Sequence, residues 1–260
     1  MIFTLFYSNS RGLSNIFLGI GVFIISIFSV KQAVASHIVG GVMTYECFGN
    51  NDYQINLTIY RDCNGSGAPF DQFAPIGVFN SSGNLINLFN AQYPGSTPVP
   101  IILNNPCLIS PPNVCVERAD YQIMITLPPL AGGYTIAYQR CCRNGSALNI
   151  TNPISMGSTY LVKIPDPGLA TCNSSPTFNN PPPVMMCNGF EFTYDLSATD
   201  IDGDSLVYEF GEPINGGDQI NPAPNPPSSP PYVSIPWSAG FSTNNQIPSN
   251  PQFTINSQTG

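Results

Sequence analysis

The sequence predicts an all-β protein with two β-sandwich domains, and three observations support this. Glycine and proline contribute 23 and 27 residues, and so many helix breakers leave little room for helices. Runs of alternating apolar and polar residues recur between turn residues, as in strands with one buried face. Eight cysteines follow an apolar leader, which favours a secreted protein braced by disulfides.

The first 35 residues are predicted to be a cleaved signal peptide. The apolar run Ile16–Val30 follows Arg11, and the small residues Ala33-Val34-Ala35 precede a cleavage site before Ser36. The run is short for a membrane span and has the flanks of a signal peptide. An uncleaved anchor is the alternative. No second apolar run follows, so we expect a secreted or cell-surface protein without membrane insertion after cleavage.

The chain after the leader is acidic. All 15 acidic residues but only five of the seven basic ones follow residue 35. Such a surface repels nucleic acid and anionic membranes, and no basic patch offsets it. We therefore expect no nucleic-acid partner.

Residues 36–172 are predicted to form a disulfide-rich sandwich. About eight strands are expected between Met43 and Pro165, with a hairpin around Ser82-Gly83. The clearest alternation places these residues on inward faces of three strands: Tyr53, Ile55, Leu57 and Ile59; Tyr121, Ile123, Ile125 and Leu127; Tyr134, Ile136 and Tyr138.

Residues 173–260 are predicted to form a second sandwich that is incomplete at its C-terminus. About four strands are expected, over 190–199, 205–210, 233–238 and 251–256. The proline-rich segment, residues 211–232, is expected to be an extended surface loop. The chain is expected to continue past Gly260, and further domains of the same chain would be its first partners.

The cysteines are predicted to form disulfides; they are Cys47, Cys63, Cys107, Cys115, Cys141, Cys142, Cys172 and Cys187. Zinc is the competing interpretation, but no C-x₂-C pair occurs. Proline-stiffened or junction-like stretches suggest Cys107–Cys115 and Cys172–Cys187. Neighbouring strand residues point to opposite faces, so Cys141 and Cys142 are expected to reach Cys47 and Cys63 in either order. A vicinal Cys141–Cys142 ring is the minority alternative.

No catalytic constellation is predicted, and the chain is expected not to be an enzyme. The string Ile38-Val39-Gly40-Gly41 also opens activated trypsin-like proteases, but the Gly-Asp-Ser-Gly-Gly segment is missing and His37 is the only histidine. A Ser-His or Cys-His mechanism therefore lacks its base. Paired carboxylates could serve a glycosidase, but the acidic residues gather in turns.

The densest acidic turn is "DIDGDS", which holds Asp200, Asp202 and Asp204. It is not an EF-hand loop, because its glycine is fourth instead of sixth. Asp-Gly between two strands is a hairpin signal. Three aspartates in one turn also repel one another unless a cation such as Ca²⁺ is bound. A plain turn and a calcium site formed by these three residues both stay open.

Two resemblances follow from these motifs. "SPTFNN", "FEFTYDLSATDIDGDSLVYEF" and "FTINSQTG" resemble a cadherin-like, Ig-like domain of bacterial surface proteins. In cadherins the corresponding Asp-x-Asp helps to bind Ca²⁺ at a domain boundary, which implies this role for Asp200 and Asp202. Asp204 is additional to that pattern.

The first domain is similar to the N-terminal region of large surface proteins of gliding Bacteroidetes. "SHIVGG", "YRDCNGSGAPF", "NPCLISPPNVCVE" and "YQRCCRNG" carry this resemblance. Such proteins often have Ig-like repeats and a C-terminal gliding-motility-associated or type IX secretion sorting domain, of which this chain shows none. The resemblance implies an exported protein on the cell surface and no particular reaction.

The function expected from the sequence is therefore a non-enzymatic structural or adhesive module of a secreted surface protein. The alternative is a carbohydrate-binding module or part of a glycan-active enzyme. Trp237, and Tyr232 at the end of the proline-rich segment, would then contact a glycan, although a lone Trp in a sandwich more often packs in the core. Glycans or cell-surface proteins are the partners that these two hypotheses predict.

Overall fold

The computed structural model describes residues 38–64, 67–100 and 113–260. These residues contain no α-helix, and their single 3₁₀ turn is η1, Pro153–Ser155. The predicted all-β class is therefore confirmed. The predicted signal peptide, His37 and Cys107 lie outside the described residues. Within the described ranges, no helix is long and apolar enough to cross a membrane.

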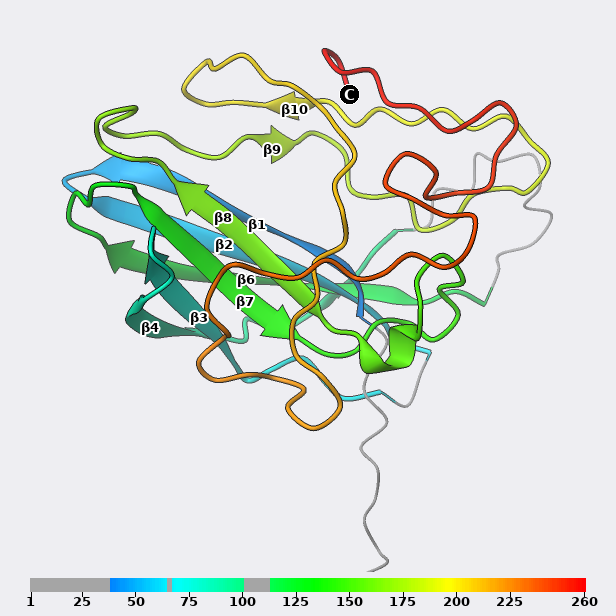
Figure 1. Ribbon diagram of the computed structural model, residues 1–260, viewed down its shortest axis with the longest axis horizontal. Coiled ribbons are helices and arrows are strands. Elements are labelled where there is room, and N and C mark those ends of the chain that lie inside the picture. Colours follow the sequence, from blue (N-terminus) through cyan, green and yellow to red (C-terminus); the bar gives the residue numbers. More distant parts are fainter. Residues whose placement is uncertain (1–37, 65–66, 101–112) are drawn as a thin grey trace, which may run out of the picture. The chain divides into compact units, whose positions relative to one another are not determined.

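Two four-stranded antiparallel sheets form a sandwich (Figure 1). Sheet A has the order β1-β2-β6-β5, and sheet B has the order β4-β3-β7-β8. In chain order the strands are β1 Ile38–Gly49, β2 Asp52–Asp62, β3 Phe73–Asn80, β4 Leu85–Gln92, β5 Thr97–Pro98, β6 Val116–Thr126, β7 Tyr134–Arg140 and β8 Ser158–Ile164. These eight strands confirm the number expected in this part of the chain.

The core lies between the two sheets and follows the predicted alternation. On β2, Ile55 and Leu57 are fully buried, and Ile136 of β7 faces them from sheet B. Most of the predicted inward set belongs to this core, and Ile123 packs partly buried against it. The β3–β4 hairpin forms where expected, because Gly83 adopts φ +81° and donates its N–H to the carbonyl of Asn80.

The outer face of sheet B is buried as well. Phe79 of β3 is 1% exposed and Ala137 of β7 is fully buried, although neither belongs to the core between the sheets. Pro227 lies over this face, close to the Phe79–Gly77 contact. β3 is buried at every position from Ala74 to Phe79, which is typical of a strand that is covered on both faces.

The cover is the proline-rich segment, residues 211–232, which crosses in front of β7 and β8 in Figure 1. Its start pairs with the residues that follow its end: Ile214 and Ser234 form a β-bridge, and the N–H of Ile235 donates to Pro213 O at 2.8 Å. Ile235 is 1% exposed. The segment has no regular strand or helix and lies at the surface as expected, but it also packs on sheet B, where Gly216, Pro224 and Pro227 are buried.

Both β1 and β8 have their open edges covered in part. Residues after Cys172 run along β1: Tyr45 N–H donates to Ser175 Oγ at 2.9 Å, and Ser175 N–H donates back to Tyr45 O at 2.8 Å. On β8, Thr159 N–H donates to the carbonyl of Ile214 at 3.2 Å. Covering an edge in this way removes backbone groups that would otherwise pair with another chain.

Residues 173–260 contain a two-stranded sheet and little other regular structure. Its strands are β9, Thr177–Phe178, and β10, Ala198–Thr199. The strands expected over 205–210 and 251–256 are absent as regular strands, although Tyr208 N–H donates to Ser257 O at 3.0 Å. Strands need a continuous partner for their backbone groups, and these segments meet only at single points. The division into two domains stays a prediction.

The disulfides form, but with other partners than those expected. Cys47 bonds to Cys172, Cys63 to Cys115 and Cys141 to Cys142; Cys187 is disulfide-bonded as well. This excludes zinc at these thiolates. The pairs Cys107–Cys115 and Cys172–Cys187 were wrong, as was the pairing of Cys141 and Cys142 with Cys47 and Cys63.

The physical reasons lie in register and strand length. β2 and β6 pair Asp62 with Val116, so Cys63 and Cys115 are the next residues across the ladder, with Cα atoms 5.2 Å apart. β7 ends at Arg140. The alternation of side chains therefore stops before Cys141, and the two neighbouring cysteines bond to each other, with their Cα atoms 3.0 Å apart.

Phe79 and Phe73 give a matched test of the covered outer face, since both lie on β3 but are 1% and 55% exposed. Phe79→Ala is expected to lower the free energy of unfolding by about 3–5 kcal/mol, because it leaves a cavity beneath the proline-rich segment. Phe73→Ala is expected to cost less than about 1 kcal/mol. Denaturant unfolding measures both, and equal losses would show that the segment does not cover Phe79.

Candidate functional site

A pocket of about 400 Å³ lies between the proline-rich segment and the outer face of sheet B. Gln139 of β7 forms part of its floor, and the rest comes from residues 215–233. Polar side chains, prolines and one aromatic ring line it together: Gln139, Asn215, Asp218, Asn221, Ser228, Pro224, Pro226, Pro231, Tyr232 and Val233, with Gly216 and Gly217.

Tyr232 gives this pocket an unusual polar group. Its hydroxyl is buried and has no hydrogen-bond partner among the described residues. Burial raises the pKa of Tyr232 to about 12, so the hydroxyl stays protonated at neutral pH and can both donate and accept. Tyrosine hydroxyls usually find a partner when buried, and the same lack of a partner among the described residues is found at the buried Nε1 of Trp237.

Trp237, the other aromatic residue singled out in the sequence, does not line the pocket. It pairs instead with the loop after β7, where Ile150 and Trp237 form an antiparallel bridge and Thr151 Oγ1 donates to Trp237 O at 3.2 Å. The structure therefore separates the two aromatic candidates and places only Tyr232 at the pocket.

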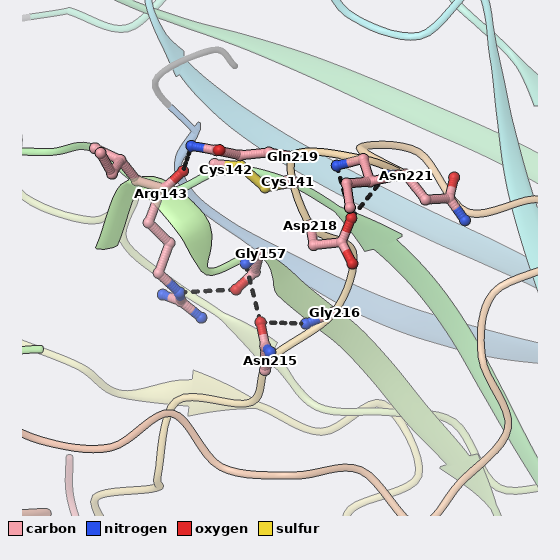
Figure 2. The surroundings of a disulfide bond; sticks show 11 residues. Cys141, Cys142, Arg143, Gly157, Asn215, Gly216, Asp218, Gln219 and Asn221 are labelled. Atoms are coloured by element: carbon pink, nitrogen blue, oxygen red, sulfur yellow. Dashed lines mark hydrogen bonds between the residues drawn. A yellow bond between two sulfur atoms is a disulfide. The ribbon is translucent and has the colours of Figure 1, made fainter. Parts of the chain in front are cut away.

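Asn215 and Asp218 hold the rim in shape (Figure 2). Asn215 Oδ1 accepts hydrogen bonds from Gly157 N–H at 2.9 Å and Gly216 N–H at 3.0 Å. Asp218 Oδ1 accepts from the N–H groups of Ile220 and Asn221 at 2.8 and 2.7 Å. Each side chain accepts these hydrogen bonds through its Oδ1 atom, which also fixes the positions of Asn215 Nδ2 and Asp218 Oδ2.

The floor is fixed by a hydrogen-bonded pair of side chains. Gln139 Nε2 donates to Ser228 Oγ at 2.8 Å and to Thr159 Oγ1 at 3.0 Å, and Ser228 N–H donates to Gln139 Oε1 at 2.9 Å. Gln139 is 1% exposed. A buried polar side chain of this kind needs all its partners, and they come from both β8 and the proline-rich segment.

The Cys141–Cys142 disulfide lies beside the same rim (Figure 2). Both cysteines are buried, and Cys141 N–H donates to Pro222 O at 2.8 Å. A second hydrogen bond connects the proline-rich segment to η1: Gln219 Nε2 donates to Ile154 O at 3.0 Å. Sequence patterns did not predict these contacts, because the residues are far apart along the chain.

A larger groove of about 1160 Å³ lies between residues 186–196 and 247–256. Its walls are two of the segments that were predicted as strands of the second domain, and they include Phe192, Tyr194 and Phe253. Phe253 stacks on Phe210 with ring centroids 5.3 Å apart. Polar side chains of this groove are held by hydrogen bonds as well: Gln252 Nε2 donates to Asn244 O, and Asn256 Oδ1 accepts from Gln258 and Thr259 N–H.

The acidic turn is held by its own hydrogen bonds. Asp200 Oδ1 accepts from the N–H groups of Asp202 at 2.9 Å and Asp204 at 3.1 Å, while Gly203 takes φ +82°. Asp202 Oδ2 accepts from Ser174 N–H at 2.6 Å. The turn therefore follows β10 and docks beside the segment that covers β1.

The carboxylates of this turn also act on Tyr45 of β1. Burial raises the pKa of the Tyr45 hydroxyl, and the charges of Asp202 and Asp200 add to the rise. Because such charge effects are short-ranged in water, they agree with the docking of the turn beside the end of β1.

The structure does not gather the three aspartates of this turn into one metal-binding group. Calcium takes about six to eight oxygen ligands, whereas no three His, Cys, Asp or Glu side chains in the described ranges are grouped to hold a metal. Asp200 and Asp202 already accept backbone hydrogen bonds. Calcium binding at Asp200, Asp202 and Asp204 stays a prediction from the sequence.

Three carboxylates of the sandwich, those of Asp71, Glu117 and Asp120, pair with arginines. Arg140 Nη1 lies 2.5 Å from Asp71 Oδ1, and Tyr138 donates its hydroxyl to Asp71 Oδ2 at 2.6 Å. Arg61 Nη2 lies 2.5 Å from Glu117 Oε1. These groups bind segments to one another, which is a structural use of charge.

The comparisons with known proteins find no counterpart. No protein-family model and no curated protein matches the sequence, and no solved structure matches the fold.

Asp200 provides a test of how the turn is held. Asp200→Ala is expected to lower the free energy of unfolding by about 1 kcal/mol, because two backbone N–H groups lose their acceptor. Asp200→Asn keeps an acceptor oxygen and is expected to stay close to the wild type. Thermal unfolding of both variants, with calcium and with a chelator, measures this. A calcium-dependent rise in Tm that both variants lose would instead show that the turn binds the metal.

Proposed function

We propose that this chain is a non-enzymatic extracellular module, structural or adhesive, of a secreted cell-surface protein. The observation that carries the proposal is the use of its charged side chains and cysteines as cross-links. Arg61 and Arg140 pair with carboxylates, and Arg143 donates to the carbonyls of Gly157 and Ile214. Groups that could do chemistry are thus occupied in holding strands and segments together.

The location rests on the disulfides and on the leader. Several disulfides indicate an extracellular environment, because cytosolic thiols are kept reduced. The predicted signal peptide and the resemblance to surface proteins of gliding bacteria support export to the cell surface. An association with motility would follow from that resemblance.

A structural role is supported by the way residues 173–260 are attached. The Cys47–Cys172 disulfide connects β1 to the start of this region, and Ser174 and Ser175 extend the contact along the strand. Tension applied between the two parts would pass through a covalent bond and a strand edge. Such a joint suits a stalk or spacer in a longer chain.

An adhesive role is supported by the surface of the β3–β4 hairpin. Residues 67–100 contain one charged side chain, Asp71, which is paired with Arg140. Phe73, Leu85 and Ile86 are 42–55% exposed on these strands. A neutral, partly apolar surface on an acidic protein can approach another surface without the repulsion that the rest of the chain would meet.

Deleting the gene in the producing cells is expected to reduce their attachment to surfaces or polymers, and the wild-type gene should restore it. Counting attached cells under flow measures the effect. A deletion strain with unchanged attachment and spreading would contradict the proposal.

Removing the Cys47–Cys172 disulfide separates the structural role from the adhesive one. Cys47→Ala/Cys172→Ala is expected to lower the free energy of unfolding by about 2–4 kcal/mol, because the bond restrains a long loop of the unfolded chain. If the joint bears load, complementation with this variant should restore attachment at rest and lose it under flow.

A further inference from the structure

The edge strands of the two sheets differ in how well they are protected. The edges of β1 and β8 are covered in part, by Ser175 and by Ile214. β5 has only two residues, one of which is Pro98. β4 has eight residues, with no proline and no charged side chain among them. A strand of this kind pairs readily with another strand when its edge is open.

The register of β4 shows which of its backbone groups are open. Tyr93 N–H donates to Gln72 O at 3.0 Å, one step beyond the last pair of the β3–β4 ladder. Hydrogen-bonded and non-hydrogen-bonded pairs alternate along an antiparallel ladder. Leu88, Asn90 and Gln92 therefore turn their N–H and C=O groups away from β3.

No other strand or loop within the described ranges forms a backbone hydrogen bond with this side of β4. Asn90 and Gln92 are exposed. The Leu88 N–H donates to the side chain of its neighbour, Asn87 Oδ1, at 2.8 Å, which agrees with its direction away from β3. A carbonyl of another strand can replace that exposed side chain. The chemistry of this edge is therefore suited to an extended backbone.

The open groups are arranged so that β4 can pair with itself. Asn90 lies midway between Leu88 and Gln92, so a second copy that runs antiparallel places its Gln92 opposite Leu88 and its Asn90 opposite Asn90. Residues opposite each other in this way exchange both of their N–H···O bonds. The interface is then isologous, as in most closed dimers, and it joins the B sheets of the two copies.

Charge favours a second copy as the occupant of this edge. Residues 72–116 contain no charged side chain, although the whole chain has a net charge of −8. Two copies therefore repel each other least where their β4 strands meet. A basic partner would gain most at the acidic surfaces and nothing from charge at this edge. Leu85 and Ile86, which are 42% and 50% exposed, add apolar area to the neutral strand.

We propose that β4 pairs antiparallel with β4 of a second copy of this chain, in the register centred on Asn90. The inference deepens the proposed adhesive function and rests on it, because the second copy would be the partner that the module holds. An interface of one strand pair is small, so the dimer is expected to have a micromolar or weaker Kd. Many copies on one surface raise the effective concentration and strengthen such a contact.

Sedimentation velocity of the full secreted chain, from micromolar to millimolar concentration, tests the proposal. The wild type is expected to pass from monomer to dimer and to form nothing larger. Asn90→Lys places two like charges opposite each other and is expected to weaken the dimer about fivefold. Its Tm should stay level, because Asn90 is exposed and its backbone groups do not bond to β3.

Gln122→Lys is the matched control, because Gln122 is exposed on β6, in the other sheet, and the substitution adds the same charge. It is expected to leave the dimer as strong as in the wild type. Asn90→Glu alone should weaken the dimer, and an equal mixture of Asn90→Lys and Asn90→Glu should restore it, because opposite charges then face each other. Variants that had merely lost stability would not show this recovery.

Four results would overturn the inference: the wild type stays monomeric, the two lysine variants dimerise equally well, the mixture shows no recovery, or the chain forms open-ended aggregates. The proposed function is judged separately by attachment of the deletion strain. If the wild-type gene restores attachment but the chain stays monomeric, the adhesive function stands and β4 is not its basis. If attachment never depended on the gene, the adhesive function itself fails, whatever the chain does in solution.

Discussion

The outer face of sheet B is the constraint on which much of this structure depends. A β-sandwich ordinarily buries one face of each sheet and leaves the other to water, but Phe79 and Ala137 make this second face apolar. Something must therefore cover it, and the cover comes from residues 211–232, far along the chain. Its prolines reduce the conformational freedom lost on ordering, so a segment without regular structure can still pack as a third layer.

Few charges remain to stabilise the fold, since charged residues make up 8% of the chain. Arg118 pairs with Asp120 along β6, but the other arginines connect separate segments: Arg140 reaches Asp71, and Arg143 reaches the carbonyls of Gly157, just before β8, and of Ile214 in the cover. The disulfide from Cys47 acts in the same way at the edge of β1. Such cross-links stabilise the open strand edges. They also stabilise the proline-rich segment, which has no strand and so no ladder of backbone hydrogen bonds.

Local pattern predicted the sandwich well, because alternation in β2, β6 and β7 reports directly which residues face the core. The alternation in single strands could not predict contacts between residues that lie far apart along the chain. The pairing of Cys63 with Cys115 depends on the register of β2 and β6, which no single strand reveals. The pocket depends on which segment covers β3 and β7. One local signal was available for the cover: "FAPIGVF" in β3 lacks alternation and already indicates burial on both faces.

The contacts that hold the proline-rich segment on sheet B explain how an unpaired hydroxyl can persist at Tyr232. Tyr232 belongs to a loop whose ends pair at Ile214 and Ser234 and whose middle is held by Ser228 on Gln139. Those contacts and the burial of Phe79 fix the backbone, so the loop cannot move to relieve one hydroxyl without losing several other interactions. Strained or unsatisfied groups persist where the surroundings determine them in this way. The contacts that cover sheet B therefore also hold Tyr232 where its hydroxyl has no partner among the described residues.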